Sequence, residues 1–188
     1  MVRTFIALVI PKAWIDHLSR IAQDLAGQMS GLSWVKPENM HITIRFLGDL
    51  GDSGVRRAGE SARRGVEALP AFTAKLGAPG AFPAMDQPRV LWVGLSEGAE
   101  QAAAVAKGVN LRLQQDGFGP PDKPFRPHIT LARVREQARG VEKFRQYAPP
   151  PPPEGALLDR IVVMKSDLHP AGARYTALEE IRLRTPGA

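Results

Sequence analysis

The sequence contains two short segments that match each other, Lys36–Ile44 and Lys123–Leu131. Aligned on their histidines, both read Lys-Pro, three further residues, and then His-Ile-Thr followed by an aliphatic residue. Successive side chains of a β-strand point to opposite faces, so each histidine shares a face with its threonine while the apolar residues face a core. The two segments therefore predict a duplicated fold in which each half offers one imidazole to a shared cleft.

The order of elements around the two segments repeats as well. Each histidine strand is expected to follow a helix and a loop, and to precede a helix and two β segments. The helices are expected over residues 11–30, 53–69, 96–117 and 136–147, and the strands over residues 3–10, 40–47, 72–76, 89–95, 127–134, 156–166 and 174–184. A repeat of about ninety residues with strand pairs joined by short turns predicts an α+β fold with antiparallel sheets.

Composition limits the class of protein. The length of 188 residues suits one domain, here expected to span residues 1–188. The net charge of +6 comes mostly from arginine, which fits either a polyanionic partner such as RNA or a basic surface with no partner. Without cysteine, thiolate chemistry is excluded and a cytoplasmic location is expected. The apolar run of residues 5–10 is too short for a signal peptide, and no stretch reaches the length of a membrane span.

Two imidazoles without another obvious catalytic group suit in-line attack at phosphorus, because one can remove a proton while the other gives one. The candidate residues are His41 and His128, with Thr43 and Thr130 placed to hold phosphoryl oxygens. Arg133 falls on the opposite face of a regular strand and would reach the cleft only through a bulge or bend. The ATP-binding phosphate loop and common metalloprotease and hydrolase motifs are absent, so neither ATP nor a metal nor another cofactor is expected.

Several other residues allow two interpretations. The arginines of one expected helix are either a solvated face or a contact for an RNA backbone (Arg56, Arg57, Arg63 and Arg64). Trp34 and Trp92 are expected in the core rather than as platforms for bases. Arg45 and Arg126 stand next to the two motifs and are candidates for further phosphate contacts. Phe46 is out of phase with His41 in a regular strand, although it lies close to the cleft in sequence.

These residues resemble the two-histidine (2H) phosphoesterase superfamily, and within it the RNA 2′,3′-cyclic phosphodiesterases, also called 2′-5′ RNA ligases. The resemblance spans almost the whole chain. Besides the two histidine motifs it includes Arg3–Leu8, Trp34–Val35 with Pro37–Asn39, Phe46–Gly48, Phe82–Pro83, Pro88–Trp92, Arg133, and Ser166–Leu168 with Gly172 and Tyr175.

The resemblance implies a bilobal fold with pseudo-twofold symmetry, a central basic cleft lined by antiparallel sheets, and helices packed outside. It also implies hydrolysis of an RNA 2′,3′-cyclic phosphate to a 2′-phosphomonoester. By position, His41 would be the proton donor to the leaving 3′ oxygen and His128 the proton acceptor from water. Thr43, Thr130 and Arg133 would hold the phosphate, and Phe46 matches a position near the nucleobase.

The expected partner is RNA with 2′,3′-cyclic phosphate ends, tRNA fragments among them, without a membrane or an obligate protein partner. The same site run in reverse would join RNA ends through a 2′-5′ bond without ATP. Two alternatives stay open. The chain could be a phosphodiesterase for small cyclic nucleotides or 2′-5′ oligonucleotides, or a module that binds RNA ends with little turnover.

Overall fold

The structure is a computed structural model that describes residues 1–167, 169 and 172–185, without the side chains of residues 136 and 137. Leu168 and, in the expected turn at residues 169–172, Pro170 and Ala171 lie outside these residues. No helix in the described part is long and apolar enough to cross a membrane.

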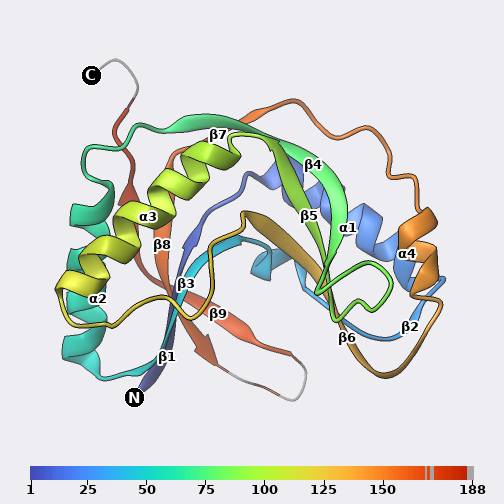
Figure 1. The fold of residues 1–188 in the computed structure, drawn as a ribbon, viewed down its shortest axis with the longest axis horizontal. Helices are drawn as coiled ribbons and strands as arrows, with labels where there is room; N and C mark the ends of the chain where they lie inside the picture. The colour runs from blue at the N-terminus through green and yellow to red at the C-terminus, as the bar shows by residue number, and fades with distance from the viewer. Residues whose placement is uncertain (168, 170–171, 186–188) are drawn as a thin grey trace.

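The described part of the chain contains nine strands and four helices, arranged in space as Figure 1 shows. The strands are β1 (Val2–Leu8), β2 (Ser30–Trp34), β3 (Ile42–Leu50), β4 (Phe72–Phe82), β5 (Val90–Glu97), β6 (His128–Arg139), β7 (Ala156–Leu158), β8 (Arg160–Asp167) and β9 (Arg174–Arg182). The helices are α1 (Lys12–Ala26), α2 (Asp52–Val66), α3 (Ala99–Gln115) and α4 (Glu142–Gln146), with a 3₁₀ turn η1 (Pro37–Asn39). The chain therefore has the α+β composition that the sequence predicts.

The strands form one antiparallel sheet in the order β7-β4-β5-β6-β3-β1-β8-β9, with β2 paired to β6. The sheet has two arms of matching order, outward from β6 and outward from β3. We call the arm of β2, β4, β5, β6 and β7 the His128 lobe, and the arm of β1, β3, β8 and β9 the His41 lobe. A single residue pair, Ile42 with Ile129, joins β3 to β6 and thus the two arms.

The lobes do not correspond to the two halves of the sequence. Strand β4 follows the His41 strand in the chain but pairs with β5 and β7 in the His128 lobe. Reciprocally, β8 follows the His128 strand but pairs with β1 and β9 in the His41 lobe. The first half thus gives β2 and β4, and the second half gives β8 and β9, to the lobe that carries the other half's histidine.

The main core lies between the helices and one face of the sheet. Ile42 and Ile129 are fully buried there, as the strand alternation predicts. Helix α1 packs against β2 and β6, whereas α2 packs against β1, β3 and β9 (Figure 1). Each large apolar side chain buried in this way contributes about 1.5–3 kcal/mol. The helices supply Trp14, Leu18, Ile21, Leu25, Val66, Val105, Val109 and Leu113 to this core.

Strand β1 is apolar on both of its faces because each face is covered. Ile6 and Leu8 enter the main core. On the opposite face, Phe5 and Ala7 pack with Val162, and Val9, Met164 and Tyr175 pack against them. We call these six residues the outer cluster. The continuous apolar run at the start of the chain is thus a strand buried on two sides.

Helices α2 and α3 lie against each other at two glycines. A methyl group added to Gly65 would stand 2.7 Å from the carbonyl oxygen of Gly108, which is closer than real side chains approach. Only glycine at this crossing lets the two backbones come together.

Two expectations about the elements are wrong. The helix expected over residues 136–147 is a strand in its first part, because β6 continues to Arg139 and α4 begins only at Glu142. Strand β2 was not expected, and its pairing with β6 explains the difference: Ser30 is paired with Arg139 and Trp34 with Ala132. The pairs of Val134 with Leu32 and of Arg139 with Ser30 hold this segment of β6 extended at its two ends, against its helix propensity.

Candidate active site

The two histidine motifs meet at the pair of residues that joins the lobes. Because Ile42 is paired with Ile129 in antiparallel register, the next positions bring His41 opposite Thr130 and Thr43 opposite His128. These four side chains share the sheet face away from the main core, around a local twofold axis at the isoleucine pair. The register thus builds the shared site that the repeated motif predicts.

Each imidazole is held by a carbonyl group two residues earlier in the chain. The Nδ1 of His41 donates a hydrogen bond to the carbonyl oxygen of Asn39 at 2.7 Å, and that of His128 donates to the carbonyl oxygen of Arg126 at 2.6 Å. A proton fixed on Nδ1 leaves Nε2 as the atom that exchanges protons. The Nε2 of His41 lies 2.9 Å from the hydroxyl oxygen of Thr43, which donates to it while the ring is neutral.

Asn39 also holds η1, the 3₁₀ turn that precedes His41, in position. Its side-chain Nδ2 donates to the carbonyl oxygen of Ala173 at 2.7 Å, so η1 is tied to the start of β9. Asn39 is itself buried. The motif comparison gave no role to this residue, because the hydrogen bond bridges positions far apart in the sequence.

Aromatic rings surround both imidazoles. His41 lies 5.0 Å from the ring of Phe5 and 5.5 Å from that of Tyr175, measured between centroids. His128 lies 4.9 Å from Phe82 in an edge-on arrangement and 6.0 Å from Trp92. These rings remove water from one side of each imidazole. Trp92 is half-buried on the histidine face, where it is paired with Thr130, so the expectation that it lies in the core is wrong.

A β-bulge in each histidine strand places Phe46 and Arg133 on the same face as the histidines, although a regular strand would place them on the opposite face. The register of β3 against β1 skips Ile44, and that of β6 against β5 skips Leu131. Both skipped residues stand three positions after their histidine. One extra residue reverses the alternation beyond it, so Phe46 and Arg133, each five positions after a histidine, lie on the histidine face.

Other observations agree with this placement. The Phe46 ring is 5.6 Å from Phe5, which in turn contacts His41, and its side chain is 51% exposed. Arg133 is exposed and its charge acts on both imidazoles. The regular-strand expectation for these two residues is therefore wrong, because it contained no bulge.

The free site favours neutral imidazoles. Burial, together with the nearby charges of His128 and Arg133, lowers the pKa of His41 to about 4, and the hydrogen bond to the Asn39 carbonyl opposes this shift. Burial also lowers the pKa of His128, with Arg133 acting in the same direction against the Arg126 carbonyl. The positive charge of Arg133 thus opposes the protonation of both imidazoles.

Arg45 belongs to the scaffold. Its side chain is buried, and its guanidinium donates to Asn110 Oδ1 and to the carbonyl oxygens of Phe118, Gly119 and Pro120 at 2.9–3.1 Å. This arginine fastens the loop that leads to His128, so the idea of an added phosphate contact at this position is wrong.

Most of the arginines on α2 also have partners within the protein. Arg63 forms an ion pair with Glu179, and Arg64 with Asp116. The guanidinium of Arg57 lies 5.1 Å above the ring of Phe118. These contacts favour a structural role for the cluster over an RNA contact, with Arg56 exposed beside them.

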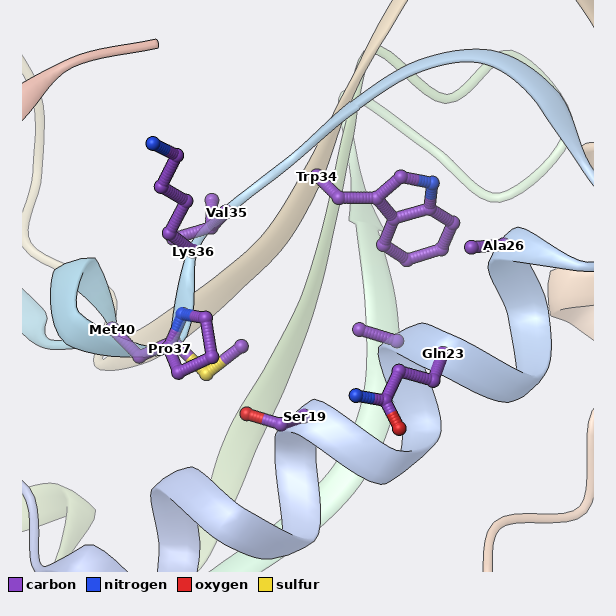
Figure 2. A pocket seen from close by; sticks show the side chains of 9 residues that line it. Ser19, Gln23, Ala26, Trp34, Val35, Lys36, Pro37 and Met40 are labelled. Carbon is purple, nitrogen blue, oxygen red and sulfur yellow. The ribbon is translucent and has the colours of Figure 1, made fainter. Parts of the chain in front are cut away.

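One hollow in the structure lies away from this site. An apolar hollow of about 260 Å³ lies between α1 and the segment from β2 to η1 (Figure 2). Trp34, Pro37 and Met40 line it opposite Ser19, Gln23 and Ala26 of α1 (Figure 2). It contains neither histidine. Among the described residues, no group of three histidine, cysteine or acidic side chains is arranged to hold a metal ion.

The arrangement can bind one tetrahedral anion between two proton-exchanging nitrogens. Two threonine hydroxyls can donate to its oxygens, and Arg133 can offset its charge. The imidazoles approach from two strands related by the local twofold axis, which suits a proton donor and a proton acceptor on either side of phosphorus.

Comparison with known proteins gives a consistent result. Residues 8–92 and 93–175 each match the family described as LigT like phosphoesterase. An RNA 2′,3′-cyclic phosphodiesterase of Aquifex aeolicus is 30% identical over 190 residues, which cover 97% of this chain and 98% of the relative. The protein of that name from Thermotoga maritima is 33% identical over 178 residues, or 95% and 94% of the two chains.

Among solved structures, TT0787 of Thermus thermophilus superimposes with a TM-score of 0.79 at 27% identity. The superposition covers 98% of this chain and 99% of that one. The duplicated family match coincides with the duplicated histidine strand, and the similarity extends over the full length. This chain therefore belongs to the LigT-like phosphoesterase family.

Proposed function

We propose that this protein hydrolyses RNA ends that carry a 2′,3′-cyclic phosphate to 2′-phosphomonoesters, by acid/base catalysis between His41 and His128 without a metal ion. The observation that carries the proposal is the twofold arrangement of two imidazoles, each with its Nδ1 bound to a carbonyl oxygen and its Nε2 left for proton exchange. The relatives from Aquifex aeolicus and Thermotoga maritima are named RNA 2′,3′-cyclic phosphodiesterase, which supports an RNA 2′,3′-cyclic phosphate as the substrate.

In the proposed reaction, the Nε2 of His128 takes a proton from water while the water oxygen attacks phosphorus. The bond from phosphorus to the 3′ oxygen breaks, and the Nε2 of His41 gives its proton to that oxygen. The product keeps the phosphate on the 2′ oxygen. Thr43, Thr130 and Arg133 hold the non-bridging oxygens, and Phe46 contacts the nucleobase.

The acid must first acquire its proton, since the pKa of His41 is about 4 in the free site. Raising that pKa to about 7 takes about 4 kcal/mol. One unit of negative charge at about 4 Å supplies about that much in a protein site of intermediate dielectric. The negative charge of the bound substrate therefore raises the pKa of His41, so that His41 is protonated mainly in the complex.

We propose that residues 1–188 act as one domain with two pseudo-symmetric lobes, because β8 and β9 complete the lobe of His41. The substrate class would place the enzyme in the cytoplasm, with tRNA fragments among its substrates. Ligation would use the same groups, with an RNA 5′-hydroxyl in place of water.

The deciding experiment uses a defined RNA that ends in a 2′,3′-cyclic phosphate, incubated with the protein in chelator. The expected product is the 2′-monophosphate, formed at a rate that depends on pH as a bell-shaped curve. A 3′-monophosphate would reverse the assignment of acid and base. Tight binding without turnover would instead support an RNA-end binding module, and equal turnover of cyclic mononucleotides would support the small-substrate alternative.

A further inference from the structure

The histidine face of β6 continues beyond Arg133 to a second arginine. Val134 packs towards the main core, so Arg133 and Arg135 both point to the other face. Ser33 of β2 is paired with Arg133 in the register. The guanidinium of Arg135 donates to the Ser33 hydroxyl oxygen at 3.2 Å. Arg135 is thus held beside the site by the neighbouring strand, two residues beyond the proposed phosphate ligand.

The charge of this pair is not neutralised within the described side chains. Neither Arg133 nor Arg135 has a carboxylate at ion-pair distance among them. Within the described part of the chain, seven of the 25 lysine and arginine residues do form ion pairs with carboxylates, namely Lys12, Arg63, Arg64, Lys75, Arg160, Lys165 and Arg182. Two neighbouring arginines that have no carboxylate partner among the described side chains form a surface that attracts phosphate groups.

The two arginines stand at different distances from the reaction centre. Arg133 acts electrostatically on both imidazoles, whereas Arg135 is not among the groups that perturb either one. Two residues along a strand correspond to about 6.6 Å. Arg135 therefore lies one step outside the position of the reacting phosphate, along the same strand.

Taking the proposed function as given, we infer that Arg135 and Ser33 form a second phosphate subsite, which binds the phosphodiester on the 5′ side of the terminal nucleotide. A guanidinium suits this ligand because its fork can contact two phosphate oxygens. The hydroxyl proton of Ser33 stays available for the same phosphate, since the hydroxyl only accepts from Arg135. The subsite makes the enzyme select oligonucleotide ends over cyclic mononucleotides.

The test compares two substrates with the same terminal base, a nucleoside 2′,3′-cyclic monophosphate and a short RNA with the same cyclic end. For Arg135→Ala, the ratio of kcat/KM for the RNA to that for the mononucleotide falls roughly fivefold, mainly through KM. The slope of log KM against log salt for the RNA decreases by about 0.7, the value for one lost phosphate contact on a single strand. Arg135→Lys keeps part of the preference.

The matched control is Arg56→Ala, an exposed arginine of α2 on the helical side of the sheet, for which the ratio stays at the wild-type value. Overturning results are an unchanged ratio in Arg135→Ala, or an equal fall in Arg56→Ala. If the wild-type protein turns over neither substrate, the proposed function fails. If it turns over both and Arg135→Ala keeps the wild-type ratio, only the subsite fails.

Discussion

The two histidine strands are built alike up to the bulge and differ just beyond it. Each has a histidine bound to a carbonyl two residues earlier, a threonine two residues later, and an extra residue at the third position. At the fifth position one strand carries Phe46 and the other Arg133. The same β-bulge thus places an aromatic ring on one side of the site and a positive charge on the other.

This difference gives the substrate a direction. Symmetric imidazoles alone would accept a phosphate in two opposite orientations. The His41 lobe has the exposed Phe46 ring above the outer cluster, which suits a nucleobase. The His128 lobe offers Arg133, which suits a phosphate. In the proposed reaction, the duplication provides the two histidines for proton transfer, and the difference at one position determines which is the donor and which the acceptor.

The largest effect is expected when either histidine is removed. His41→Ala and His128→Ala should each lower kcat for a cyclic-phosphate RNA by about 10²- to 10⁴-fold. A substrate with an activated leaving group separates the two roles, because such a group leaves without a proton. On that substrate His41→Ala recovers much of its rate and His128→Ala does not, as measured by steady-state kinetics. Recovery in both variants or in neither would contradict the assignment.

The second largest effect is expected in the pH dependence of the free energy of unfolding, to which His41 contributes. An unfolded histidine binds a proton near pH 6.5 and the folded His41 near 4, so the unfolded state binds more protons between these values. The free energy of unfolding therefore falls as the pH drops through this window, by about 3 kcal/mol from His41 alone. His41→Ala should lose that part of the pH dependence in urea unfolding at pH 7 and pH 4.5.

Arg56→Ala serves as the control for that measurement, because it changes an exposed residue of α2 and keeps both histidines. A variant without His41 that still shows the full wild-type loss of stability would exclude this explanation. Titration by NMR provides a second check: the pKa of His41 should rise when a 2′-nucleotide is added.

Substitution of the residue five positions after each histidine, Phe46 or Arg133, should have a smaller effect on catalysis, and the effect should differ between the two lobes. Arg133→Met is expected to reduce kcat/KM by about 10- to 100-fold through the lost phosphate contact, and to raise the pKa of both histidines because a positive charge is removed. Phe46→Ala should raise KM by about tenfold, the value of one stacked base. Salt should weaken the effect of Arg133→Met but leave that of Phe46→Ala nearly unchanged. The reverse pattern would contradict the proposed direction of the substrate.

The threonines should show the smallest effect. Thr43→Val and Thr130→Val each remove one hydroxyl, and kcat/KM should fall about fivefold for each. Since the two positions are related by the local twofold axis, the losses should be similar and the double variant should multiply them. A loss confined to Thr43→Val would indicate that its hydroxyl acts on His41 rather than on the phosphate.

Much of this architecture could be predicted from two matching strings. Strand alternation placed Ile42 and Ile129 in the core, and the repeat predicted two halves around one site. The bulges at Ile44 and Leu131 could not be predicted, because a skipped residue depends on the partner strand. The carbonyl contacts to His41 and His128 were equally hidden, since every residue offers a carbonyl group. Arg45 was misread because an arginine beside a motif does not reveal that it faces inward.

The exchange of β4 and β8 between the lobes has a consequence for the history of such a chain. An ancestor of half this length would have left its last strand without a partner in its own lobe. Two copies could fold together by trading that strand, as domain-swapped dimers do. The present chain has the topology of such a dimer joined into one polypeptide. A gene cut between the halves should therefore give active protein only when both fragments are made in the same cell.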